Sequence, residues 1–223
     1  MVFGLSRSSA GERLDRIEAT LQRMFTDDRH AFDLAMSSLV AGADPRTVGP
    51  ELRATDHRVN EAEREIRREL VVHASVHGGI DTPAVLIYMS IVKDVERVGD
   101  YAKNLYDLAS DGADLTTSQH AAHYVQLRDE VSRQISDVAA AFGERDTERS
   151  RTLLDRGDEL LDAFDDAVSR LVKDEHPSRT AVAEALTYRY LKRIVAHLLN
   201  VLSAVVMPLD QLDYFDEDPE DRR

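Results

Sequence analysis

The chain has 223 residues, no cysteine and a formal net charge of -14, from 42 acidic residues against 28 lysines and arginines. The lack of cysteine excludes a disulfide scaffold and a thiolate metal site, and it is typical of a reducing cytosol. An acidic chain without a basic cluster argues against nucleic-acid binding. No stretch approaches the ~20 apolar residues of a membrane span, so we expect a cytoplasmic protein.

Glycines that end helices, and Asp-Pro or Thr-Pro pairs that start them, divide the chain into six predicted helices. Within residues 85–109 the apolar residues recur in alternating steps of four and three, which is the seam of a helical bundle. No strand pattern of comparable length occurs. The predicted helices cover residues 11–41, 46–76, 83–110, 117–142, 147–173 and 178–207.

The two halves of the chain match each other. The first predicted helix falls on the fourth at a shift of 103 residues, the second on the fifth at 102, and the third on the sixth at 96, with apolar positions in register. Polar matches accompany them, such as Asp44 with Asp146 and Asn104 with Asn200. The sequence therefore predicts an all-α fold of two pseudo-symmetric three-helix bundles related by duplication. The two repeats and a disordered acidic tail are expected at residues 11–112, 117–207 and 208–223.

The third predicted helix carries an unusual polar face. Glu96, Asp100 and Asn104 lie four residues apart, and Gly99 stands among them. Glycine costs a helix about 1 kcal/mol relative to alanine, and carboxylates four apart repel each other mildly. We expect Gly99 to let another side chain or backbone approach closely beside the two acids.

A second polar row lies on the second predicted helix, where Asp56, Asn60 and Glu63 share one face. The second half repeats the row as Asp158, Asp162 and Asp165. Facing rows of carboxylates need cations, and hard or borderline divalent metals take such oxygen ligands. The rows therefore predict a metal site, with a solvated acidic face as the alternative.

Residues 91–105, IVKDVERVGDYAKNL, resemble the signature of PhoU-domain proteins, a Leu-Glu-Arg-Ile-Gly-Asp pattern followed by Asn. The resemblance covers roughly residues 20–207 and implies the family's fold of two similar three-helix bundles. The family's Glu/Asp-x-x-x-Asp motif binds surface metal clusters. The resemblance thus implies a divalent or trivalent metal ion on Glu96 and Asp100, with a neighbouring pattern on the row described above, Asp56, Asn60 and Glu63.

The second half departs from this pattern. Lys192 stands at the position that corresponds to Glu96, Val195 at that of Gly99, and Ala196 at that of Asp100. We therefore predict that metal binds only in the first half. In the second half we expect Lys192 to act as a tethered cation beside the acid row.

The resemblance implies a non-enzymatic regulator of phosphate uptake and homeostasis. Its expected partners are a phosphate transporter subunit, often the cytoplasmic ATPase, and a sensor histidine kinase, and a homodimer is compatible with the sequence. No residues are predicted to be catalytic or to bind an organic cofactor, because there is no nucleophile constellation and no Walker-type loop.

Three alternatives stay open. The start MVFGLSR resembles a related group of helical proteins that accompany other phosphate transporters, and an unassigned helical binding module is a second alternative. A ferritin-like carboxylate protein is disfavoured, because no glutamate has a histidine three residues later.

Other side chains have more ordinary expectations. His73 and His77, one turn apart, could bind zinc, but a surface or capping role is expected. Ion pairing with neighbouring acids is expected for Arg97, as for its counterpart Arg193. The second-half tyrosines, Tyr188 and Tyr190, are expected to pack rather than react.

Overall fold

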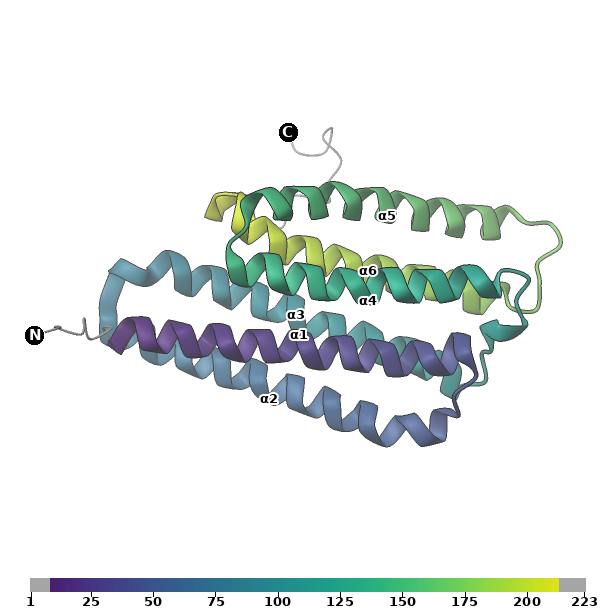
Figure 1. Ribbon diagram of the computed structural model, residues 1–223, viewed down its shortest axis with the longest axis horizontal. Coiled ribbons are helices and arrows are strands. Elements are labelled where there is room, and N and C mark those ends of the chain that lie inside the picture. Colours follow the sequence, from purple (N-terminus) through teal and green to yellow (C-terminus); the bar gives the residue numbers. More distant parts are fainter. Residues whose placement is uncertain (1–8, 213–223) are drawn as a thin grey trace, which may run out of the picture.

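In the computed structural model, which describes residues 9–212, six long α-helices follow one another, joined by short turns (Figure 1). No strand occurs within these residues, so the predicted all-α fold is confirmed. The helices are α1 (Ser9–Ala41), α2 (Pro45–His77), α3 (Thr82–Ser110), α4 (Ala121–Glu144), α5 (Thr147–Lys173) and α6 (Ala181–Val206). Three 3-10 turns, η1 (Gly78–Asp81), η2 (Leu115–Thr117) and η3 (Leu209–Gln211), lie between or after them.

The sixth helix begins at Ala181 rather than 178, and the fourth differs from the prediction at both ends. The fourth helix begins at Ala121 rather than 117, because η2 occupies the preceding residues. It ends at Glu144, and Arg145 rather than Gly143 adopts the left-handed conformation at its end, with φ of 53°. The predicted ends at Gly42 and Gly112 are confirmed, because both have positive φ, which glycine adopts without steric cost.

The predicted disordered tail is described only in part. Leu209–Gln211 form η3, so this part of the tail is ordered. Residues 213–223 lie outside the described residues, as do residues 1–8 with the start MVFGLSR.

The helices pack in two groups of three, α1 with α2 and α3, and α5 and α4 with α6 (Figure 1). The groups meet where α3 lies against α6 and α1 against α4. The predicted seam of α3 forms the core, since Val95, Val98 and Leu105 are fully buried. Whether one half superimposes on the other stays a prediction.

A buried polar contact joins the two groups across α3 and α6. Asp94 Oδ1 lies 2.8 Å from His197 Nδ1 and accepts a hydrogen bond of 2.9 Å from Asn200 Nδ2. The Tyr101 ring stacks on the His197 imidazole, with centroids 5.7 Å apart. A buried polar group is costly unless it is paired, so this contact favours one docking register of the two halves.

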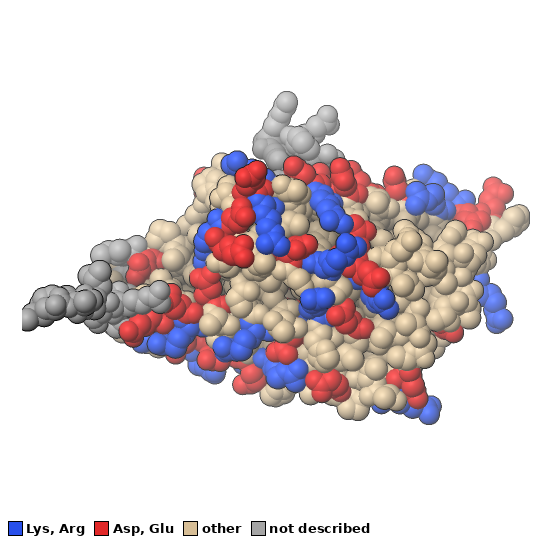
Figure 2. Space-filling view, in the orientation of Figure 1, with Lys and Arg blue, Asp and Glu red and all other residues tan. Residues whose placement is uncertain are grey.

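The surface mixes both signs of charge. Figure 2 shows acidic and basic side chains interspersed on one face rather than gathered into a single basic patch. Among the described helices, none is both long enough and apolar enough to cross a membrane.

Candidate metal centre

The first pair of predicted acids meets across α2 and α3. Asp56 comes from α2 and Asp100 from α3, and the ammonium group of Lys103 lies between them. Its Nζ atom is 3.1 Å from Asp56 Oδ1 and 3.4 Å from Asp100 Oδ1. Burial lowers the pKa of Lys103, but its contacts with the two carboxylates outweigh this and raise it overall. The lysine therefore stays charged and holds the two acids together.

The second pair follows the same plan along the helices. Glu63 of α2 and Glu96 of α3 are nearly buried, with 8% and 7% of their surface exposed. Lys93 Nζ lies 2.5 Å from Glu96 Oε2 and 4.0 Å from Glu63 Oε1. The guanidinium of Arg67 also lies 2.9 Å from Glu63 Oε1. The structure thus brings four of the five predicted residues together as two carboxylate pairs, each with its own lysine.

The fifth predicted residue, Asn60, is used differently. Its side-chain nitrogen donates a hydrogen bond of 2.9 Å to the backbone oxygen of Asp56, one turn earlier in the same helix. This contact directs the amide along α2 rather than across to α3.

Asp28 of α1 is the functional candidate that the sequence analysis missed. Its side chain is fully buried, and neither carboxylate oxygen has a hydrogen-bond partner. A Cβ atom on Gly99 would lie 2.5 Å from Asp28 Oδ1, closer than real side chains approach. This explains the glycine in the acidic face of α3: it leaves room for a carboxylate that arrives from another helix.

A signal for Asp28 was present in the sequence. The apolar seam of α1 runs through Leu21, Met24 and Phe32, all fully buried, and Asp28 stands four residues after Met24 in that seam. An acid at a core position without a neighbouring base is unusual, because burying an unpaired charge is costly. A search of the first helix for polar residues within its apolar seam therefore identifies Asp28 from the sequence.

We define the acidic cluster as Asp28, Asp56, Glu63, Glu96 and Asp100. It has more carboxylates than neighbouring cations. Burial raises the pKa of Asp28 well above its usual value of 3.8, and the charges of Asp27, Glu96, Asp100 and Asp56 raise it further. Burial also raises the pKa of Glu96, although its hydrogen bond from Lys93 opposes the rise. The cluster therefore has an excess of negative charge that two lysines only partly offset.

The donor set fits a hard cation, because every side chain of the cluster offers carboxylate oxygens and the Asp28 oxygens lack partners. In the arrangement seen here, the described residues include no group of three or more His, Asp or Glu side chains already placed around one metal position. The ammonium group of each lysine lies between the two carboxylates of its own pair, Lys93 in the glutamate pair and Lys103 in the aspartate pair. A metal ion would take the place of these ammonium groups.

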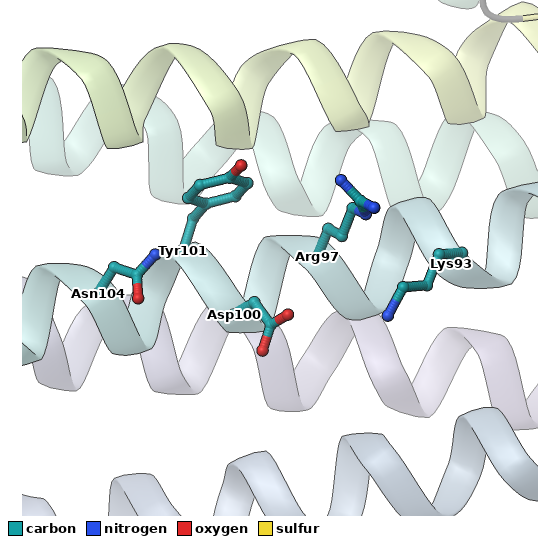
Figure 3. A pocket seen from close by; sticks show the side chains of 5 residues that line it. All are labelled: Lys93, Arg97, Asp100, Tyr101 and Asn104. Carbon is teal, nitrogen blue, oxygen red and sulfur yellow. The ribbon is translucent and has the colours of Figure 1, made fainter.

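A hollow of about 380 Å³ lies beside the cluster (Figure 3). Its lining residues all come from α3, and Figure 3 shows Arg97 and Tyr101 pointing to the side of α6 while Asp100 points to the opposite side. Arg97 is exposed here. The hollow gives solvent access to Asp100 and Lys93, which also line it.

The second half confirms the predicted contact of Lys192. Its ammonium group pairs with the Asp165 carboxylate, and the guanidinium of Arg189 lies 3.7 Å from the same side chain. At the position that corresponds to Lys103, Leu199 packs on Gly157, where an added Cβ would meet Leu199 Cδ2 at 2.3 Å. Asp165 of the α5 row therefore faces two cations from α6, Lys192 and Arg189, and the position that corresponds to Lys103 is apolar.

The remaining candidates are structural. The surface role expected for His73 is wrong: its ring is fully buried, and Nε2 lies 3.1 Å from Asp81 Oδ2 in η1. The reason is that the turn after α2 folds back and places Asp81 beside the ring. The expected packing of Tyr188 is confirmed, since its ring contacts those of Tyr124 and Phe164.

Comparison with known proteins shows which family and which solved structures this all-helical chain is similar to. Residues 21–109 match the PhoU domain family. Crystal structures of PhoU from Pseudomonas aeruginosa and of the phosphate transport system regulatory protein PhoU from Streptococcus pneumoniae have the same fold. The first has a TM-score of 0.73 at 20% identity over 87% of this chain and 96% of that chain. For the second these values are 0.76, 14%, 88% and 95%.

The sequence relatives are more similar in sequence than these two structures, but they overlap with a smaller part of the chain. A functionally uncharacterised protein of Deinococcus radiodurans is 26% identical over 163 residues, 67% of this chain and 57% of that protein. The phosphate-specific transport system accessory protein PhoU homolog 1 of Thermotoga maritima is 44% identical over 50 residues, 22% of this chain and 21% of that protein. The alignments thus span just over half of one relative and about a fifth of the other. The chain is thus similar to the PhoU domain family over residues 21–109, and its fold resembles that of the two PhoU crystal structures over both halves.

Proposed function

We propose that this chain is a non-enzymatic regulator of phosphate uptake, acting as a cytoplasmic adaptor on a phosphate transporter. The observation that carries the proposal is the acidic cluster, which lies inside the part of the chain that matches the PhoU domain. The partner would be a transporter subunit, its ATPase first, with a sensor histidine kinase as a second contact. Long helical faces and a polar, lysine-bridged site suit binding and regulation rather than turnover.

We also propose that the cluster binds a divalent or trivalent metal ion through Asp28, Asp56, Glu63, Glu96 and Asp100. When bound, the ion would neutralise the surplus carboxylate charge and tie α1, α2 and α3 together. Lys93 and Lys103 would swing out to solvent, since both side chains are already more than a third exposed. Metal binding would thereby change the charge that the site presents to a partner.

The regulatory role is tested by deleting the gene in the source organism and measuring phosphate uptake and the phosphate response. We expect deregulated uptake, restored by the wild-type gene. Affinity capture from native membranes grown with ample phosphate should retain a phosphate transporter subunit. Unchanged uptake in a strain without a second copy, together with no transporter in the captured material, would reject the adaptor role.

The metal site is tested separately by titrating Mn²⁺ into the purified chain and following binding by calorimetry. The Glu96→Ala, Asp100→Ala double variant should lose binding. A matched control is Asp162→Ala with Asp166→Ala, which removes two exposed acids from α5. Binding that survives in the first variant, or is lost equally in the control, would contradict the assignment.

A further inference from the structure

A second cavity lies at the far end of the second half, where α4 begins and α5 passes into α6 (right end of Figure 1). Its volume is about 720 Å³, within the range of small-molecule sites. The lining comes from α4, α5, α6 and the α5–α6 connection, none of which contributes to the acidic cluster. This cavity is therefore independent of the proposed metal site.

Two aromatic rings line the cavity, Tyr124 of α4 and Tyr188 of α6, with centroids 5.5 Å apart. Tyr124 is fully buried, and its hydroxyl makes no hydrogen bond of good geometry, although Tyr188 and Glu184 lie close enough to influence its pKa. Burial is the main cause that raises the pKa of this hydroxyl, so it stays protonated. Because Tyr124 has no accessible surface, it supports the cavity wall through its contact with Tyr188. The exposed ring of His123, 6.4 Å from that of Tyr188, is the aromatic face open to a ligand.

Basic side chains surround the opening. Arg170 and Lys173 of the last turns of α5 line it, and three exposed histidines join them, His120, His123 and His176. The amino-terminal ends of α4 and α6 also lie here, and their dipoles favour an anion.

The two acids of the lining are already engaged. Glu184 is buried and accepts hydrogen bonds of 2.7 Å from both Ser118 Oγ and Thr180 Oγ1. Asp174, at the end of α5, accepts a hydrogen bond of 2.9 Å from the backbone nitrogen of His176. These contacts direct both carboxylates to protein donors and leave the arginine and lysine to a ligand.

We propose that this cavity binds a small phosphorylated organic anion, with its phosphate at Arg170 and Lys173 and its planar body against the rings of His123 and Tyr188. Arginine forks onto phosphate oxygens, lysine adds a compact charge, and flat rings stack on aromatic faces. A phosphate carries more charge and more acceptor oxygens than a single carboxylate, so it pairs better with several basic groups at once. The proposal does not rest on the regulatory function or on metal binding.

The test is calorimetric titration of the full chain with adenosine 5′-monophosphate, inorganic phosphate and adenosine. We expect the nucleotide to bind at least about tenfold more tightly than either fragment, since each carries only half of the recognised chemistry. If inorganic phosphate binds as tightly as the nucleotide, the proposed contact with the planar body is rejected. If adenosine does, the proposed phosphate contact is rejected. No binding of the nucleotide at millimolar concentration would overturn the site.

Two variants locate the site. Arg170→Ala should weaken nucleotide binding about tenfold or more, whereas Arg151→Ala, on the same helix and equally exposed but outside the lining, should leave it unchanged. His123→Ala should weaken nucleotide binding about fivefold without lowering the melting temperature, because it removes an exposed ring that faces the planar body. Unchanged affinity in Arg170→Ala, or in His123→Ala, would contradict the proposal.

Discussion

At the centre of the first half, α1 buries the carboxylate of Asp28 against Gly99 of α3, whereas the second half has two valines at the corresponding places. The shifts of 103 and 96 residues put Asp28 on Val131 and Gly99 on Val195, and both valines are fully buried. One half therefore pays a stability cost for an unpaired acid and a helical glycine, and the other fills the same place with apolar packing. The comparison teaches that the first half keeps a costly arrangement that the fold itself does not require.

The neighbouring cations follow the same division. The chain has only four lysines among its 28 basic residues, and Lys93, Lys103 and Lys192 all contact acids of the two rows. Two of them serve the first half and one the second. A compact ammonium on a flexible stem fits between carboxylates where a planar guanidinium would not, so the lysines are placed where a metal ion would be.

The largest expected effect comes from giving the second half the acid of the first. Val131→Asp should destabilise the chain by about 4 kcal/mol, because it buries an unpaired charge in an apolar core, where Val195 stands at the position that corresponds to Gly99. Urea unfolding followed by helical circular dichroism measures the change. Val131→Thr, which keeps the shape with a smaller polar group, should cost much less. Equal losses in the two variants would break the contrast between the halves.

The next effect concerns the glycine of the first half. Gly99→Ala should cost about 2 kcal/mol, because the added Cβ overlaps the Asp28 carboxylate in a packed core. In an Asp28→Ala background the same change should instead stabilise the chain by about 1 kcal/mol, the ordinary gain of alanine over glycine in a helix. A double-mutant cycle by urea unfolding gives both values. The same sign in both backgrounds would show that Asp28 is not the reason for the glycine.

A smaller effect is the pH dependence of Asp28 in the metal-free chain. Its folded pKa is raised above the usual 3.8 by burial first and then by Asp27 and the acids of the cluster. Below about pH 4 both states hold the proton, and as the pH rises the unfolded chain loses it first. The stability of the wild type should therefore fall with rising pH relative to Asp28→Asn, until the raised pKa is passed.

At pH 7 and with EDTA present, Asp28→Asn should be more stable than the wild type by about 1 kcal/mol. Unfolding measured from pH 4 to pH 8 for both proteins checks this. A difference that stays constant over this range would mean that Asp28 titrates normally.

The smallest expected effect is the difference in stability loss between removing Lys192 of the second half and removing Lys103 of the first. Lys192→Ala should cost under about 0.5 kcal/mol, because half of the Asp165 side chain is exposed and such pairs contribute little. Lys103→Ala should cost more, about 1 kcal/mol, since it leaves Asp56 and Asp100 facing a buried acid without a cation. Equal losses in thermal unfolding would mean that the first half has no special charge surplus.

Much of the fold could be predicted because its signals are local. The α3 seam, the ends at Gly42 and Gly112, and the six helices follow from periodicity and backbone freedom within a few residues. The start of α4 could not be predicted as well, because η2 competes for the same residues. The end of that helix depends on tertiary contacts, since the guanidinium of Arg145 lies over the Phe142 ring and donates a hydrogen bond to the Tyr88 hydroxyl.

The candidate site was predicted in part. Four acids on α2 and α3 were named from spacing alone, because steps of three and four put residues on one helical face whatever the neighbours are. Asp28 was missed because its importance depends on which helix α3 packs against, and spacing within a helix carries no such information. The cavity of Tyr124 and Arg170 was missed for the same reason, since its walls come from three helices.

The sequence by itself determined the helices, their apolar faces and the acid rows, since each depends on residues within a few turns of one another. Only the tertiary structure decided that α1 brings a carboxylate to Gly99, that lysines bridge the rows, and that α4, α5 and α6 enclose a basic cavity. The physical reason is that burial and charge interactions depend on distance in space. Residues 28 and 99 become neighbours only when helices far apart in the chain pack together.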